Sequence, residues 1–149
     1  ESPVYAAHNV HELLLQCYDE FPESGRMQAT IRVFPAVPGK WPEAVFHDLR
    51  TAGAFLLSAV RKDGFTQWVS VKSLAGEPCR IRPNLQGQVR TSGKRKFTLE
   101  DMGEGVYSLD LRKDEEVILY SDLTLPDLNI APLPDQIEKR NRYGLKQNE

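Results

Sequence analysis

Residues 54–73 read AFLLSAVRKDGFTQWVSVKS, two apolar runs joined by a short polar turn. The runs at 54–61 and 67–73 are rich in aromatic and β-branched residues, which favour strands. Between them, Lys62-Asp63-Gly64 is typical of a tight turn, because glycine supplies the positive φ that such a turn requires. These residues therefore predict a β-hairpin.

Similar short runs lie on both sides of this hairpin. One precedes it at 44–49, and others follow at 79–82, 88–90, 96–99, 106–111 and 116–120. About eight short strands separated by turn signals are typical of an antiparallel β-sandwich. The sequence therefore predicts a mainly β fold whose antiparallel β-sandwich occupies residues 44–122.

One α-helix is predicted ahead of the sandwich, within residues 1–20. Ser2 is a suitable N-cap, and Pro3 suits the first helical position because the helix does not use its missing N–H. The helix is expected to run to about Tyr18, since apolar residues recur at helical spacing at Val10, Leu13, Leu14 and Cys17. So wide an apolar face needs more than one partner surface.

The segments between and after these elements are rich in proline. Residues 21–43 predict a short strand at Ile31 and Val33, followed by a Pro-rich loop linker that carries Trp41. After Ser121 three prolines fall within nine residues, which blocks both helix and central strand. Residues 123–149 are therefore expected to form an extended Pro-rich tail.

The composition narrows the range of functions. A formal net charge of −2 over 149 residues offers no basic field, so no nucleic-acid partner is expected. No apolar run approaches the roughly 18 residues that a membrane span needs, so no membrane partner is expected either. Cys17 and Cys79 form no Cys-x-x-Cys motif and are expected to be free, buried thiols, with a disulfide between helix and sandwich as the alternative.

Three kinds of polar cluster in the sequence could carry chemistry. His8, His11 and Glu12 share the helix, but their order and spacing differ from the His-Glu-x-x-His zinc motif, so we expect no metal site. The carboxylate pairs and the basic cluster are expected to be solvated turn residues; they are Glu100-Asp101, Glu115-Glu116, Arg90, Lys94, Arg95 and Lys96. No dinucleotide or phosphate-binding motif is present, so no cofactor is expected.

Aromatic side chains provide a candidate glycan site. Trp68 lies within a predicted strand, and a flat aromatic ring on an exposed sheet face can stack on a sugar. Trp41 and Tyr107 are weaker candidates of the same kind. Trp68 is therefore the candidate substrate-binding residue.

Several motifs, taken in order, resemble one enzyme family. They are Glu12-Leu13-Leu14-Leu15-Gln16, Ile31-Arg32-Val33-Phe34-Pro35-Ala36-Val37-Pro38, Trp41, Phe46, Asp48-Leu49-Arg50, Gly53-Ala54-Phe55 and Trp68-Val69. This pattern, over roughly residues 1–82, resembles the C-terminal part of family 95 glycoside hydrolases, the α-L-fucosidase-like group. The resemblance implies a bacterial enzyme, secreted or periplasmic, with an (α/α)6 catalytic barrel followed by a C-terminal β-sandwich.

The resemblance also suggests what this chain does. The helix within residues 1–20 would be a remnant of the barrel, and the sandwich would pack against the barrel and support it. Family members carry an Asp-Gly-Asn-Phe-Gly segment ahead of this helix, and counting back from Gln16 puts Glu1 in the register of its catalytic Asp. Glu1 is therefore the candidate catalytic carboxylate, although Ser2-Pro3-Val4-Tyr5 replaces the rest of that segment. The chain alone is expected to be inactive.

Two other functions are compatible with the same residues. A carbohydrate-binding module would bind a glycan through Trp68. A protein-interaction sandwich would instead use the apolar helix, either for a partner or for self-association, because an uncovered apolar stripe promotes association.

Overall fold

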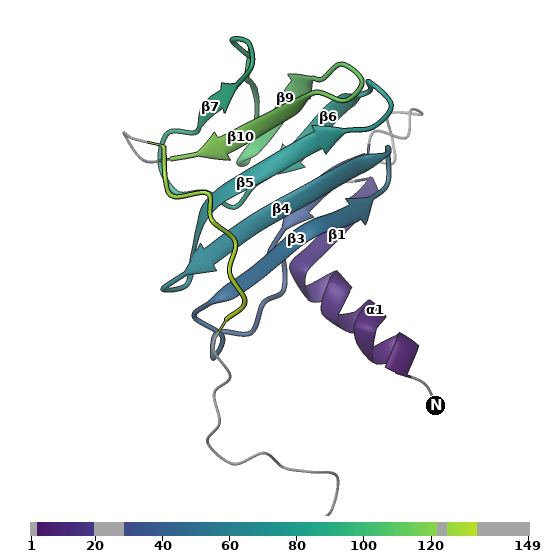
Figure 1. Ribbon diagram of the computed structural model, residues 1–149, viewed down its shortest axis with the longest axis vertical. Helices are drawn as coiled ribbons and strands as arrows, with labels where there is room; N and C mark the ends of the chain where they lie inside the picture. Colours follow the sequence, from purple (N-terminus) through teal and green to yellow (C-terminus); the bar gives the residue numbers. More distant parts are fainter. Residues whose placement is uncertain (1–2, 20–28, 122–124, 134–149) are drawn as a thin grey trace, which may run out of the picture.

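The structure is a computed structural model that describes residues 3–19, 29–121 and 125–133. Within them the chain forms one helix and ten strands. Helix α1 (Pro3–Leu14) comes first and runs directly into β1 (Leu15–Asp19). The ten strands, β1 included, form two sheets that pack face to face (Figure 1).

Each sheet has five strands, and the chain passes repeatedly from one sheet to the other. Sheet A has the order β1, β2 (Ala29–Val33), β6 (Pro78–Arg82), β9 (Val106–Asp110) and β8 (Glu100–Gly103). Sheet B has the order β3 (Ala44–Thr51), β4 (Phe55–Lys62), β5 (Phe65–Ser73), β10 (Glu116–Tyr120) and β7 (Arg90–Gly93). Strands β2 and β6 are parallel, and the other described pairs are antiparallel. The prediction of a mainly β, two-sheet sandwich with an N-terminal helix is confirmed.

The core lies between the sheets and follows the two-residue period of the strands. Sheet B contributes alternate residues of β4, β5 and β10, and sheet A contributes those of β1, β2, β6 and β9. The most completely buried side chains include Leu57, Val69, Val71, Ile81 and Leu119. At roughly 1.5–3 kcal/mol for each large aliphatic side chain, this layer is the main source of stability.

The β4–β5 hairpin forms where the sequence predicts it. Lys62 pairs with Phe65 around the two-residue loop Asp63-Gly64. Both loop residues have positive φ, 51° for Asp63 and 83° for Gly64, as hairpin turns with the strand twist require.

Two predictions of secondary structure are wrong. The helix does not run to Tyr18, because it ends at Leu14 and the next five residues pair with β2. This pairing buries Leu15, which is 1% exposed, inside the sandwich. Residues 96–99 form no strand; the strand in this region is β8, four residues further on, and Phe97 instead fills the core from a loop.

The part of the predicted tail that the structure describes, 125–133, has no regular secondary structure. In Figure 1 this yellow-green segment runs across the outer face of sheet B, in front of β4 and β3. The indole Nε1–H of Trp68 donates to the carbonyl oxygen of Asp127 at 3.0 Å. The segment therefore covers part of a sheet face instead of leaving the domain at once.

Candidate functional site

Helix α1 is exposed along most of its length, and only its last turn, where Leu14 packs against the core, is partly buried. None of its twelve residues is buried, and Val4, Tyr5 and Val10 are 71%, 70% and 44% exposed. Figure 1 shows the helix projecting away from both sheets. An isolated helix of this length is only marginally stable in water. Its exposed apolar side chains therefore indicate that another surface packs against it and stabilises it.

The C-terminal end of α1 is fixed to the sandwich. The backbone N–H of Phe34 donates to the carbonyl of Leu14 at 2.8 Å, and that of Ala36 donates to the carbonyl of Leu13 at 3.4 Å. Leu15, the next residue, is anchored in the core. The helix therefore leaves the sandwich in a direction set by these contacts.

A groove of about 350 Å³ adjoins this end of the helix; its lining is mostly apolar but includes Lys40 and Glu43. Leu14, Trp41, Pro42, Val45 and Leu133 are among its lining residues. Trp41 and Leu133 remain 38% and 45% exposed. We call these two residues, together with Val10 of α1, the apolar surface.

Trp68, the predicted sugar-stacking residue, lies on the outer face of sheet B. Its side chain is only 3% exposed, and its indole is tied to Asp127 in the 125–133 segment. Stacking of a sugar on this ring would therefore require the segment to move away. Sugar stacking on Trp68 therefore stays a prediction, and it requires displacement of the 125–133 segment.

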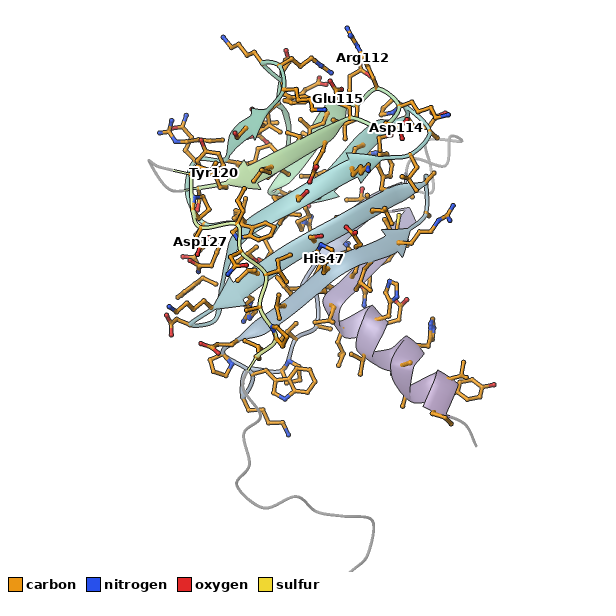
Figure 2. The ribbon with its side chains drawn as sticks, viewed as in Figure 1. His47, Arg112, Asp114, Glu115, Tyr120 and Asp127 are labelled. Carbon is orange, nitrogen blue, oxygen red and sulfur yellow. The ribbon has the colours of Figure 1, made fainter. Side chains whose placement is uncertain are left out.

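The carboxylates Glu115 and Glu116 have separate structural partners. Arg95 binds Glu115 through two parallel bonds, Nε to Oε1 at 2.7 Å and Nη2 to Oε2 at 2.9 Å. These bonds, with one from the backbone N–H of Arg112, lower the pKa of Glu115 to about 2. Figure 2 shows Glu115 and Arg112 together at one end of the sandwich. Arg95 is therefore held in an ion pair, although it lies in a loop and its side chain stays 34% exposed.

Glu116 faces the outer side of sheet B, where the structure forms a polar cavity. The hydroxyl of Ser70 donates to Glu116 Oε1 at 2.5 Å. Asp48 and Ser58 form a second hydroxyl–carboxylate pair beside it, and the cavity between the pairs measures about 160 Å³. No sequence motif marks this site, because its polar residues come from four different strands; they are Asp48, Ser58, Ser70 and Glu116.

The remaining candidate groups lie elsewhere. His8, His11 and Glu12 are on α1, and in the described part of the chain no three His, Cys, Asp or Glu side chains lie close enough together to hold a metal ion. Both cysteines are free thiols; burial raises the pKa of Cys79 to about 12 and also raises that of the half-buried Cys17. Glu1 lies outside the described residues. Among the residues that are described, no helix is long and apolar enough to cross a membrane.

Comparison with known proteins identifies the domain. The protein-family model for the glycoside hydrolase family 95 C-terminal domain matches residues 26–119, well over half of the chain. The matched span contains β2 to β9 and most of β10, whereas α1 and β1 precede it. No curated protein matches the chain. The chain therefore belongs to the family of glycoside hydrolase family 95 C-terminal domains.

Proposed function

We propose that this domain packs against the (α/α)6 catalytic barrel of its parent glycoside hydrolase and supports it, with α1 as the main contact. A family 95 C-terminal domain implies association with the catalytic domain of the parent. The observation that carries the proposal is the exposure of α1, a twelve-residue helix with no buried side chain.

The side chains of α1 suit such a contact. Ala6, Val10 and Leu13 lie at i, i+4 and i+7, so they form one stripe along the helix. The polar residues His8 and Glu12 lie on the opposite side. A helix that presents an apolar stripe can pack into the groove between two helices of a bundle.

The groove beside α1 extends the contact onto the sandwich. Trp41 is large, partly exposed and held in a loop by a backbone hydrogen bond from its N–H to the carbonyl of Pro38 at 2.9 Å. Tryptophan is enriched among the residues that dominate interface energies. A partner that covers α1 and Trp41 together would bury both parts of the apolar surface.

The proposal is tested with the parent polypeptide carrying Val10→Asp. Val10 is 44% exposed, so its full burial would contribute about 1 kcal/mol, and a buried aspartate would cost at least as much again. We expect the catalytic domain of this variant to unfold at a lower temperature by differential scanning calorimetry. His8→Asp, on the opposite side of α1, is the matched control and should leave that temperature unchanged. Equal unfolding temperatures for Val10→Asp and the unmodified enzyme would refute the proposal.

We also propose that Glu1 is a catalytic carboxylate of the parent enzyme. The family resemblance supports a further proposal, that the parent is secreted or periplasmic. Counting back from Gln16, Glu1 falls in the register at which family members carry a catalytic Asp, and it is a carboxylate itself. Glu1→Gln in the parent should then abolish hydrolysis of aryl fucosides while leaving its unfolding temperature unchanged. Hydrolysis by this variant at the normal rate would remove Glu1 from the mechanism.

A further inference from the structure

The outer face of sheet B holds a small cavity that the proposed domain contact does not use. It measures about 160 Å³ and lies between the strands β3, β4, β5 and β10 and the 125–133 segment. Figure 2 shows His47, one of its lining residues, on the sheet face that this segment crosses. The apolar surface shares the 125–133 segment with this cavity through Leu133, but α1 contributes no residue to the cavity, so variants of α1 and of the cavity can be tested separately.

Two hydroxyl–carboxylate pairs line the cavity. Ser58 and Ser70 are direct cross-strand neighbours on β4 and β5, and they are only 6% and 8% exposed. Ser58 donates to Asp48 Oδ1 at 3.3 Å, and Ser70 donates to Glu116 Oε1 at 2.5 Å. A carboxylate has about four acceptor positions, so each retains capacity for further donors. The two carboxylates thus flank a pair of nearly buried hydroxyls.

A β-bulge turns Asp48 toward this pair. The register of β3 against β4 shifts between Phe46 and Leu49, and Asp48 has a φ of 50°. Its backbone N–H donates to Ser58 Oγ at 3.0 Å, so the bulge places both the amide and the carboxylate of Asp48 beside Ser58. Bulges of this kind re-aim side chains and are common next to binding sites.

The other walls of the cavity are apolar apart from His47, whose Nδ1 lies 3.8 Å from Asp48 Oδ2. Ile118 of β10, Leu128 and Ile130 of the 125–133 segment, and Trp68 line it. The cavity therefore offers hydrogen-bond acceptors on two sides and apolar contact on the others. Its volume is about half the roughly 300 Å³ at which sites for drug-sized ligands begin, so it suits one small ring and not an extended chain.

We propose that this cavity binds a single neutral sugar residue, such as the end of a glycan. A sugar ring carries hydroxyl donors around its edge and an apolar C–H face. Hydroxyls on opposite edges would donate to Asp48 and Glu116, while the C–H face would contact Ile118 and the 125–133 segment. A divalent cation fits less well, because the described residues provide no group of three or more His, Cys, Asp or Glu ligands.

The test is isothermal titration calorimetry of the 149-residue chain with D-galactose, L-fucose, D-glucose and D-xylose. We expect saturable, millimolar binding of at least one of them, together with a shift of the Trp68 indole N–H resonance, since that ring lines the cavity. Asp48→Asn and Glu116→Gln should each weaken binding about tenfold, because a neutral amide accepts hydrogen bonds less strongly than a carboxylate. Glu104→Gln, which replaces an 84% exposed carboxylate next to Arg82 on sheet A, is the matched control and should bind normally.

Three results would overturn the proposal. The first is the absence of saturable binding for all four sugars. The second is binding that Asp48→Asn and Glu116→Gln leave unchanged although both variants fold normally by circular dichroism. The third is saturable binding of calcium that the same two variants abolish, which would make the cavity a cation site. None of these results bears on α1, whose role is tested in the parent enzyme.

Discussion

The contact between Trp68 and Asp127 predicts how firmly the 125–133 segment is held. Trp68→Phe keeps an aromatic ring but removes the Nε1–H that donates to the Asp127 carbonyl at 3.0 Å. Trp68→Ala removes the ring as well. The two variants therefore separate the hydrogen bond from the packing of the indole.

The expected magnitudes follow from burial. A net hydrogen bond contributes about 1 kcal/mol, and the smaller phenyl ring adds a modest packing loss, so Trp68→Phe should cost about 1–2 kcal/mol. The indole is only 3% exposed, so Trp68→Ala should cost about 3–5 kcal/mol. Because a domain of this size is stable by roughly 5–15 kcal/mol, both variants should still fold. The inward-facing neighbours Val69 and Val71 are unaffected.

Urea unfolding followed by far-ultraviolet circular dichroism measures these costs. A second measurement uses truncation after Ser121 in a Trp41→Phe background, where fluorescence reports Trp68 alone. We expect the emission to shift to longer wavelength, because removal of the segment exposes the indole. A Trp68→Phe variant as stable as the unmodified chain, or an unshifted emission after truncation, would show that the segment does not cover this ring.

Three further predictions concern a glycine, an ion pair and a thiol. Gly76→Ala should cost about 2–4 kcal/mol in urea unfolding, because φ is +85° and the new Cβ would lie 2.8 Å from the backbone nitrogen of Lys113. Gly87→Ala, at φ +80° with nothing within 4 Å, should cost only about 1–2 kcal/mol. Glu115→Gln should be less stable than the unmodified chain at pH 7. This difference in the free energy of unfolding should narrow as pH falls from about 4.5, the ordinary pKa of glutamate, to about 2. The reason is that the ion pair keeps the Glu115 carboxyl ionised in the folded state down to about pH 2. Cys79, fully buried and with a pKa of about 12, should not react with Ellman's reagent at pH 8 in the folded chain.

Each of these predictions has a distinct contrary result. Equal losses of unfolding free energy in Gly76→Ala and Gly87→Ala would mean that the backbone moves away from the new Cβ near Lys113 without a loss of stability. A stability difference for Glu115→Gln that stays constant between pH 7 and pH 2 would mean that the ion pair does not hold the carboxyl ionised. Two rapidly reacting thiols in the native chain would show that Cys79 is accessible.

Local sequence signals predicted the parts of the fold that depend on neighbouring residues. The hairpin at Asp63-Gly64 follows from turn chemistry, and β10 occupies the predicted run at 116–120. The family was identified from the order of short motifs along the chain, and the family match confirms it. These features can be predicted without knowing which strands pack against each other across the core.

Features that depend on distant residues were missed. Leu14 and Leu15 look alike in a helical stripe, yet pairing with β2 turns the chain into a strand between them. All four residues of β8 are exposed, so no apolar pattern marks the strand, whereas Phe97 gave a strand-like signal although it fills the core from a loop. The cavity needs the β3 bulge at Asp48 and the pairing of Ser70 with Glu116, 46 residues apart in sequence.

The parallel pairing of β2 with β6 has a kinetic consequence. Residues 29–33 must meet residues 78–82, and the chain between them forms the β3–β4–β5 meander of the opposite sheet. Forming contacts between residues so distant along the chain has a larger entropic cost of loop closure than forming a hairpin between adjacent strands. Once the meander has formed, it shortens the effective loop between β2 and β6. We therefore expect pulse-labelling hydrogen exchange to show protected amides in β4 and β5 before those in β2 and β6, so that β2 and β6 pair on a preassembled β3–β4–β5 meander.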